Sequence, residues 1–227
     1  MPSWQTATVV DVRRETPSAK TLRLRLPTVS AHVAGQYYVL RLTADDGYTA
    51  SRDYSVASVP GSDTIDLTVE LLPGGEVSGF LHDVVEVGDE LEVRGPIGGW
   101  FAWDGSTPAL GVAGGSGVVP LMSMLRLSRE QTTAPFRLLV SARRPADLYY
   151  ADELSGPEVT VAYTRQTPPG YGRAAGRLVA EDLAGLLTPD QTVYVCGTPP
   201  FCDHATDLLQ SAGVDASRIR VERFGPS

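Results

Sequence analysis

The stretch Ala109-Leu-Gly-Val-Ala-Gly-Gly-Ser-Gly117 marks the point where the pattern of the chain changes. It begins as a short apolar strand and ends in a glycine-rich turn. A helical pattern follows over residues 119–127, with Pro120 in the first turn, where a helix accepts proline. A strand, a glycine-rich turn and a helix in this order are typical of an open α/β sheet.

The residues after this stretch alternate between strands and helices. We expect strands at residues 136–141, 159–163, 193–196 and 219–224, and helices at residues 146–154, 177–187 and 201–212. Such alternation indicates a parallel sheet that is covered on both faces. Ligands bind at the carboxyl ends of the strands in these sheets, so the glycine-rich turn is the expected binding point.

The residues before this stretch contain short strands that are separated by turn signals. Period-two alternation is clear over residues 20–26 and 64–71. Further strands are expected at residues 7–12, 36–42, 52–59 and 90–94, and a short helix at residues 77–84. Several short strands with regular turn signals predict a closed antiparallel barrel.

The expected fold class is therefore β plus α/β. An N-terminal antiparallel six-stranded β-barrel is followed by a doubly wound parallel α/β domain. Residues 101–108 resemble a linker, with the break near Gly105. This places the two domains at residues 1–104 and 105–227.

Composition argues against several classes of function. A net charge of −8 and a pI of about 4.9 disfavour nucleic acid or an anionic membrane as a partner, because phosphates attract basic surfaces. Two cysteines are too few for a disulfide scaffold or a four-cysteine metal site, and the histidines have no metal-binding spacing, so no metal is expected. No signal peptide or membrane-spanning run is visible, and a soluble cytoplasmic protein is the expectation.

The run Arg52-Asp-Tyr-Ser55 lies in an expected strand, where alternation puts Arg52 and Tyr54 on one face. A guanidinium beside an aromatic ring suits a ligand with a phosphate and a planar ring system. An exposed strand with one arginine and one half-buried tyrosine is the alternative.

The glycines of the central turn allow backbone N–H groups to approach a pyrophosphate at a helix N-terminus. The alternative is a tight strand-to-helix turn that binds nothing. The lysine of a Walker loop is missing, which argues against nucleotide hydrolysis.

Five short motifs occur in one order along the chain. They are Arg52-Asp-Tyr-Ser55, Thr68-Val-Glu70 with Gly75-Glu-Val-Ser78, Gly95-Pro-Ile-Gly98, Ala113-Gly-Gly-Ser-Gly-Val-Val-Pro120 and Val195-Cys-Gly-Thr-Pro199. Together they resemble the ferredoxin–NADP⁺ reductase family of flavoenzymes over nearly the whole chain. The resemblance implies a barrel that binds FAD and an α/β domain that binds NAD(P).

For FAD, the resemblance implies that Arg52 pairs with the pyrophosphate, Tyr54 packs against the flavin and Ser55 hydrogen-bonds near flavin N5. Asp53 lies within the same motif. Because alternation points Ser55 away from Tyr54, a local bend of the strand is expected there.

Further FAD contacts follow from the same resemblance. A strand backbone touches the ring edge and a helix start holds the pyrophosphate, with these residues: Thr68, Val69, Glu70, Gly75, Glu76, Val77 and Ser78. The motif at Gly95 forms a turn near the flavin. Phe224 shields the flavin where nicotinamide docks, although Gly225-Pro-Ser227 extends past it, unlike family members that end on the aromatic residue.

For NAD(P), the resemblance implies contacts from Gly115, Ser116, Gly117, Cys196, Gly197 and Thr198. Cys196 would lie beside nicotinamide C4 and flavin N5, and Glu222 near the nicotinamide. Ser55, Cys196 and Glu222 are therefore the residues expected where hydride passes. A buried structural thiol is the alternative for Cys196.

The choice between NADPH and NADH depends on Arg143, Thr164, Arg165 and Arg173, near the ends of two expected strands. A 2′-phosphate needs positive charge and hydroxyl donors, and no acidic residue at positions 164 and 165 could bind a ribose diol. NADPH is favoured. Solvated loop arginines, with NADH as the cofactor, are the alternative.

The resemblance implies an FAD-dependent NAD(P)H oxidoreductase: hydride passes from NADPH to FAD, and electrons then pass to an acceptor. Because the chain lacks the four cysteines of a ferredoxin domain, the acceptor is expected to be a separate ferredoxin or oxygenase component. Two alternatives stay open. One is a reductase of free flavin, ferric chelates or quinones, and the other is a flavin-binding regulatory module without turnover.

Overall fold

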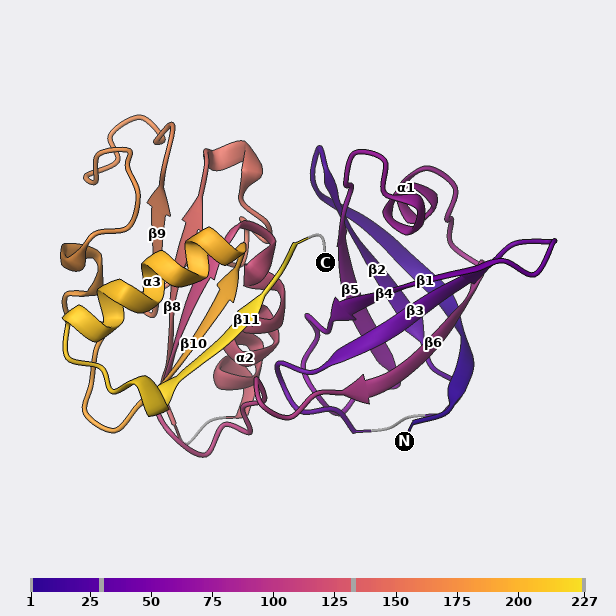
Figure 1. The fold of residues 1–227 in the computed structure, drawn as a ribbon, viewed down its shortest axis with the longest axis horizontal. Helices are drawn as coiled ribbons and strands as arrows, with labels where there is room; N and C mark the ends of the chain where they lie inside the picture. Colours follow the sequence, from indigo (N-terminus) through magenta and orange to yellow (C-terminus); the bar gives the residue numbers. More distant parts are fainter. Residues whose placement is uncertain (1, 29–30, 132–133, 226–227) are drawn as a thin grey trace.

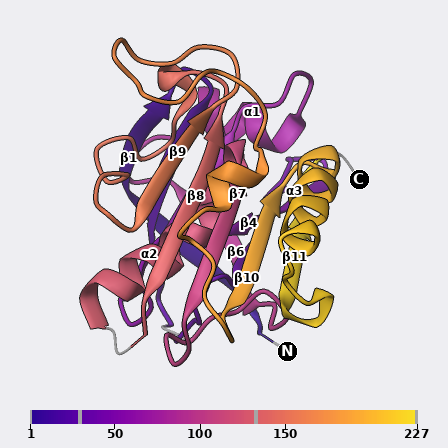
Figure 2. The same ribbon diagram turned by 90° about the vertical axis from the view of Figure 1, so that its left-hand side faces the viewer.

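Two sheets stand side by side in the computed structural model, which describes residues 2–28, 31–131 and 134–225 (Figure 1). The first sheet has six strands and the second has five. Helix α2, Val118–Gln131, packs between the two sheets, and helix α3, Pro199–Ser211, covers the far face of the second sheet (Figures 1 and 2).

The first sheet is antiparallel throughout, in the order β4-β3-β6-β1-β2-β5. Its strands are β1 Trp4–Thr16, β2 Ala19–Arg25, β3 Tyr37–Thr43, β4 Thr49–Ser55, β5 Thr64–Glu70 and β6 Glu90–Ile97. The outer strands meet where Val56 pairs with Leu67, which closes the sheet into a barrel. The expected six-stranded antiparallel barrel is confirmed.

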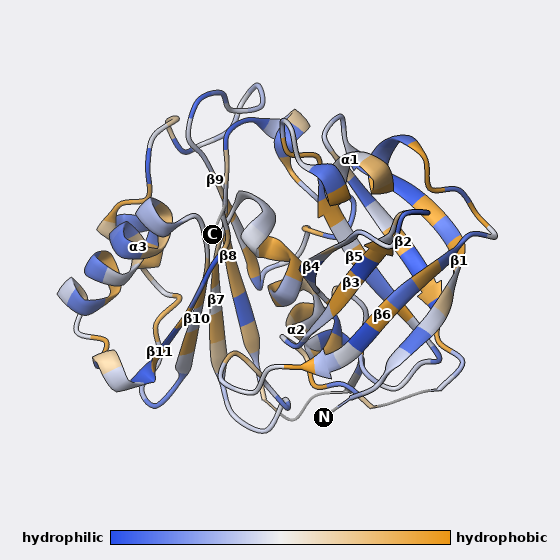
Figure 3. Cartoon of the chain, turned by 45° about the vertical axis from the view of Figure 1, so that its right-hand side comes forward, coloured by the Kyte–Doolittle hydropathy of each residue, from blue (hydrophilic) through white to orange (hydrophobic). Residues whose placement is uncertain are grey.

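Alternation decides which side chains fill the barrel. On β2, Leu22 and Leu24 are fully buried, whereas Arg23 between them points outward. Figure 3 shows this alternation as bands of blue and orange along the barrel strands. Helix α1, Glu76–Asp83, packs on the barrel through buried side chains such as Leu81.

The second sheet is parallel, in the order β11-β10-β7-β8-β9. Its strands are β7 Ala109–Gly114, β8 Phe136–Ala142, β9 Val159–Tyr163, β10 Thr192–Gly197 and β11 Ile219–Arg223. The chain steps outward from β7 to β9 and returns to the other side of β7 at β10. The carboxyl ends of β7 and β10 therefore form the switch point where such sheets bind ligands.

One expected helix, at residues 146–154, is replaced by a 3₁₀ turn at Pro145–Asp147 and an irregular segment. Tyr150 has a φ of 54°, which an α-helix excludes. This backbone places Tyr150 in the core between the two sheets. The apolar spacing of the segment therefore reflects burial there and not a helical period.

A second expected helix, at residues 177–187, is also absent, and only a 3₁₀ turn at Ala180–Leu183 forms. Gly185 follows with a φ of 73°. Leu183 and Leu186 are both buried. Their spacing of three residues fits a 3₁₀ turn as well as an α-helix, so the pattern alone was ambiguous.

Two strand ends that bear on the site also differ from expectation. β4 ends at Ser55 and not at residue 59, because the chain there leaves β3 and joins β5. Gly95, expected in a turn, lies inside β6, and the chain turns at Gly98, where φ is 99°. A Cβ atom at Gly95 would lie 2.5 Å from the Tyr38 ring, so this strand position needs glycine.

Polar contacts tie the barrel to the parallel sheet. Arg126 on α2 donates to both carboxylate oxygens of Glu153, at 2.8 and 2.5 Å, and to the Ala57 carbonyl oxygen at 2.7 Å. The Arg126 side chain is only 13% exposed. The hydroxyls of Thr68 and Tyr150 form a second hydrogen bond across the interface, at 2.5 Å.

Replacing Arg126 by alanine should destabilise the protein by about 2 kcal/mol, since the half-buried Glu153 carboxylate and the buried Ala57 carbonyl group lose their partner. Urea unfolding measures this loss. The control is Arg218→Ala, whose partner Asp190 has a side chain that is 84% exposed, and it should cost less than about 1 kcal/mol. Equal losses of unfolding free energy in the two variants would contradict the stabilising role assigned to Arg126.

Candidate active site

The end of β10 forms the centre of the candidate site. Within the sheet, Cys196 pairs with Ala113 on β7 and with Glu222 on β11. Cys196 has no exposed surface and packs in the core between the two sheets. Burial, and then the charge of Glu222, raise the pKa of its thiol well above the ordinary value, so the sulfur stays protonated at neutral pH.

The glycine-rich loop lies directly on this strand end. A Cβ atom at Gly117 would lie 2.1 Å from the Cys196 carbonyl oxygen, and one at Gly114 would lie 2.5 Å from the Phe201 ring. Residues Gly115–Gly117 form a 3₁₀ turn that leads into α2, and no side chain caps its start. The N–H groups there are suited to a phosphate, and Ser116 lies among them, partly exposed.

Strand β4 brings Arg52 and Tyr54 to the barrel side of the site. Arg52 is exposed, donates to the Ser51 carbonyl oxygen at 2.7 Å, and forms no ion pair with any residue that the structure describes. Tyr54 pairs with Tyr38 and packs on the barrel core, and burial raises its pKa to about 12. A cation free to bind an anion therefore stands two residues from an apolar ring.

Ser55 lies where the chain changes its pairing partner. It is 5% exposed and pairs with Tyr37 on β3, whereas the next residue, Val56, pairs with Leu67 on β5. Strand β4 therefore ends at Ser55, where its register with β3 is still regular, and the expected bend stays a prediction.

Acidic side chains from both sheets meet beside this point. Burial, and then the charge of Asp53, raise the pKa of Glu222 to about 7. Burial also raises the pKa of Asp53, against the charges of Arg94 and Arg52. The pKa of Tyr37 is raised by burial, by Asp53 and by Glu222. β3, β4 and β11 therefore contribute to one electrostatic cluster.

The chain end closes over the same region. The N–H group of Phe224 donates to the Gly197 carbonyl oxygen at 2.8 Å, and its half-buried ring packs on the core that contains Cys196. Thr198 is exposed at the start of α3. Residues 226 and 227, which extend past the aromatic residue, lie outside the described part of the chain.

On β5, the side chains of the second motif belong to the interface and the barrel. The Thr68 hydroxyl bonds to Tyr150, Val69 fills the barrel core, and Glu70 hydrogen-bonds to Tyr149. The contact that the resemblance implies here involves only the backbone.

The start of α1 also lacks a side-chain cap. Ser78 is buried and holds the preceding loop, because its hydroxyl accepts from the Leu72 N–H group at 3.2 Å and donates to the Gly75 carbonyl oxygen at 3.3 Å. Glu76 is exposed and Val77 is buried. Like the start of α2, this helix end leaves N–H groups for an anion.

Two exposed arginines stand at the carboxyl ends of β8 and β9. The Arg165 N–H group donates to the Arg143 carbonyl oxygen at 2.9 Å, which places the two residues side by side. Neither forms an ion pair within the described residues, and Thr164 next to them is half-buried. This end of the sheet offers free positive charge and a hydroxyl group.

Arg173 stands apart from that group, because its side chain is held within its own loop. It binds both carboxylate oxygens of Asp182, at 2.5 and 2.7 Å. Its remaining donors bond to main-chain carbonyl oxygens, including those of Ala174 and Arg177. All five guanidinium N–H groups are therefore occupied by the loop that Arg173 holds.

The cluster contains two residues that the motifs did not single out. Tyr37 lies opposite Ser55, and Arg94 on β6 contributes its charge beside Asp53. The period-two pattern of β3 was a usable signal, because it turns Tyr37 away from the barrel when Tyr38 points inward.

Within the described residues, no group of histidine, cysteine, aspartate or glutamate side chains is arranged to hold a metal ion. In the same part of the chain, no helix combines the length and the apolar character that crossing a bilayer requires.

Two family models match the chain. The oxidoreductase FAD-binding domain matches residues 6–101, and the oxidoreductase NAD-binding domain matches residues 112–207. The chain is 32% identical over 206 residues to the reductase component of propane 2-monooxygenase from Rhodococcus jostii, covering 84% of the chain and 55% of that protein. It is 33% identical over 207 residues to the glycine betaine monooxygenase reductase subunit from Pseudomonas aeruginosa, covering 85% and 56%. The chain thus spans just over half the length of these relatives.

Solved structures share the fold. The FAD/NAD-binding domain of nitric oxide dioxygenase from Vibrio cholerae superposes with a TM-score of 0.85 at 24% identity, covering 98% of this chain and 99% of that one. The ferredoxin reductase in carbazole 1,9a-dioxygenase gives 0.81 at 25%, covering 98% and 70%. With its paired FAD-binding and NAD-binding domains, the chain belongs to the ferredoxin–NADP⁺ reductase family of oxidoreductases, whose cofactors are FAD and NAD(P)H.

Proposed function

We propose that this chain accepts hydride from NADPH through FAD and passes the electrons to a separate ferredoxin or oxygenase component. The observation that carries the proposal is the convergence of β4 and β11 on one electrostatic cluster, where Asp53 acts on Glu222, and Glu222 acts on the buried Cys196 that it pairs with in the sheet. Bound FAD supplies the chemistry that joins a two-electron donor to a one-electron acceptor. The relatives named as monooxygenase reductase components support the choice of acceptor.

The barrel side of the site fits FAD. The Arg52 guanidinium group forms no ion pair within the described residues and can bind a pyrophosphate. The uncapped start of α1 at Gly75 offers N–H groups to the same pyrophosphate. Tyr54 presents a ring that packs on the barrel core, and Ser55 places a hydroxyl group at the end of β4. We assign this role to a domain of residues 1–104.

The α/β side, which we assign to residues 105–227, fits a nicotinamide cofactor. The loop Gly115–Gly117 positions uncapped N–H groups beside Cys196. The Cys196 thiol stays neutral, so its role is to position rings by contact and not to attack as a nucleophile. A cytoplasmic location is part of this proposal, since both cysteines are free thiols.

Glu222 is assigned the proton-holding position beside the reacting rings. With a pKa of about 7, its carboxyl is protonated in a large fraction of molecules at neutral pH. The protonated form avoids a second negative charge next to Asp53. A neutral carboxyl can also donate a hydrogen bond from its oxygen.

Replacing Glu222 by glutamine should change stability in a pH-dependent way. Because the folded-state pKa of about 7 exceeds the ordinary value of 4.5, the contribution of Glu222 to stability is complete below pH 4.5 and is lost as the pH rises through 7. Between pH 4.5 and pH 7, the free energy of unfolding of the variant should therefore rise relative to that of the parent protein. Urea unfolding at several pH values measures this difference. This gain in stability should be smaller when Asp53 is also replaced by asparagine. A difference in stability that does not change with pH would contradict the role assigned to Glu222.

Arg143 and Arg165 are the proposed contacts of the 2′-phosphate of NADPH, with Thr164 as a hydroxyl donor. Arg165→Ala should raise the KM for NADPH about 10-fold and leave that for NADH unchanged, because a charged hydrogen bond to the phosphate is lost. Arg144→Ala is the matched control, since Arg144 pairs with Asp147 at 3.4 Å. Equal effects on NADPH and NADH would remove Arg165 from the phosphate site.

The whole assignment is tested by anaerobic stopped-flow mixing of the FAD-loaded protein with NADPH and with NADH. Bleaching of the flavin absorbance should be rapid with NADPH. A flavin that neither nucleotide bleaches would sink the enzyme assignment and favour a binding module. Much faster bleaching by NADH would reverse the cofactor preference.

A further inference from the structure

Trp100 is the most exposed of the large apolar side chains in the described residues, at 65%. It follows the turn at Gly98, after the end of β6. The residues next to it are nevertheless fixed. Phe101 is buried, and its ring packs edge-on against Tyr194 with the ring centroids 5.3 Å apart. The Ala102 carbonyl oxygen accepts from the Tyr194 hydroxyl at 3.0 Å. An anchored segment therefore holds the indole of Trp100 at the surface.

Arg220 on β11 lies beside this ring, with its guanidinium carbon 5.6 Å from the centroid of Trp100. One guanidinium nitrogen, Nη1, donates to the Ala102 carbonyl oxygen at 3.0 Å and to the Tyr194 hydroxyl at 3.2 Å. Within the described residues, Nε and Nη2 form no hydrogen bond and Arg220 forms no ion pair. A guanidinium with free donors beside an exposed indole can bind a carboxylate of an arriving molecule.

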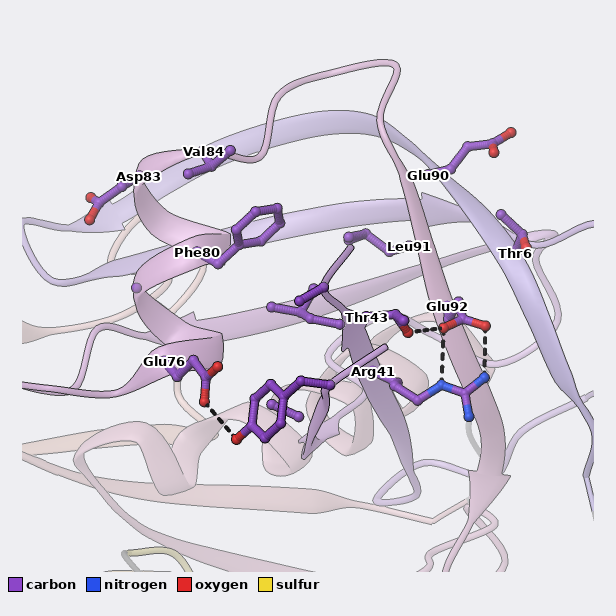
Figure 4. A pocket seen from close by; sticks show the side chains of 15 residues that line it. Thr6, Arg41, Thr43, Glu76, Phe80, Asp83, Val84, Glu90, Leu91 and Glu92 are labelled. Atoms are coloured by element: carbon purple, nitrogen blue, oxygen red, sulfur yellow. Dashed lines mark hydrogen bonds and ion pairs between the residues drawn. The ribbon is translucent and has the colours of Figure 1, made fainter. Parts of the chain in front are cut away.

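Other exposed rings lie in a different electrostatic setting. Tyr48 and Phe80 line a hollow of about 860 Å³ beside α1 (Figure 4). Arg41, the one cation among its lining residues, is bound by both carboxylate oxygens of Glu92, at 2.7 and 3.0 Å, and the other charged lining residues are acidic. Among the exposed aromatic side chains that the structure describes, Trp100 alone has a cation over its ring.

The surface around the exposed indole continues into the candidate site. Val221 packs under α3, so Arg220 and Glu222 on either side of it face the barrel. Arg220 and Glu222 lie about 7 Å apart along the strand. On the barrel side, the Tyr37 ring lies against Gly98, where a Cβ atom would be 3.4 Å from it. We call this surface the seam strip; it consists of Trp100, Arg220 and Tyr37.

We propose that the protein that accepts the electrons docks on the seam strip, with an apolar patch against Trp100 and a carboxylate against Arg220. The proposal rests on the proposed function and adds the docking face and the chemistry of the partner. A fixed tryptophan beside an arginine is the combination on which interface binding energy concentrates. Asp104, an acid near Arg220, already accepts from the Ser106 hydroxyl at 2.6 Å, so Arg220 stays available to the partner.

The electron count fixes how often the strip is used. A hydride carries two electrons, and a one-electron acceptor takes one of them. Each NADPH therefore reduces two acceptor molecules and releases one proton, and the strip binds and releases an acceptor twice per turnover. Binding there should accordingly be reversible and limited by the acceptor concentration, so its strength appears in the KM for the acceptor.

The test follows the NADPH-driven reduction of a plant-type [2Fe–2S] ferredoxin by the FAD-loaded protein. Ferricyanide serves as a small acceptor that needs no docking surface. Trp100→Ala should raise the KM for the ferredoxin about 10-fold, the effect of truncating one interface anchor. Turnover with ferricyanide should not change, because it depends on hydride transfer alone. Trp100→Phe, which keeps an aromatic ring, should recover most of the loss.

Arg220→Ala tests the charge of the partner. It should raise the KM for the ferredoxin, reduce the dependence of that KM on ionic strength, and leave the KM for a basic cytochrome c unchanged. Arg218→Ala is the matched control, because Arg218 precedes the same strand but pairs with Asp190 at 2.7 Å. Val87→Ala, at a side chain that is 62% exposed on the barrel, is the apolar control. Neither control should change the KM for the ferredoxin.

Several results would overturn the proposal. One is a KM for the ferredoxin that neither Trp100→Ala nor Arg220→Ala changes, and another is a parent protein that reduces ferricyanide but not the ferredoxin. Equal effects of Arg220→Ala on ferredoxin and cytochrome c would remove the carboxylate contact. A dimer in sedimentation that Trp100→Ala dissociates would assign the strip to a second copy of the chain. Failure of both NADPH and NADH to reduce ferricyanide would instead refute the proposed function.

Discussion

The site depends on Arg126, which joins the barrel to the parallel sheet. Its guanidinium binds the carbonyl oxygen of Ala57, two residues after Ser55, and the carboxylate of Glu153 from the segment that follows β8. This side chain thus ties the segment after β4 to α2. Because Ser55 and Cys196 belong to different sheets, their relative position depends on such contacts, together with the Thr68–Tyr150 hydrogen bond and the core between the sheets.

Charge is distributed in a consistent way around the site. Burial shifts the pKa of Tyr54, Cys196 and Glu222 toward retention of the proton, so these groups carry less negative charge near pH 7 than they would in water. Unpaired cations stand at the outer ends, at Arg52 on one side and at Arg165 on the other. A centre with reduced negative charge and free cations at both ends suits stacked planar rings whose phosphates extend outward.

Much of this could be predicted from sequence, because the strongest patterns are also the strongest physical constraints. The alternation around Leu22 and Leu24 fits a strand with one buried face. At position 117 only glycine fits, because a Cβ atom there would clash with the Cys196 carbonyl group. The segment around Tyr150 was mispredicted because its apolar side chains are buried between two sheets, and local spacing cannot distinguish that from a helix. The role of Arg173 was also hidden, since its partners depend on a loop whose conformation no short pattern encodes.

The burial of the two thiols affects how readily they are oxidised. The chain has two cysteines, and both lie near the end of β10 with their pKa raised, to about 11 for Cys202. Oxidants react with the thiolate form, which is scarce at neutral pH at both positions. Both sulfur atoms are therefore held in the form least open to conversion into sulfenic acid or mixed disulfides.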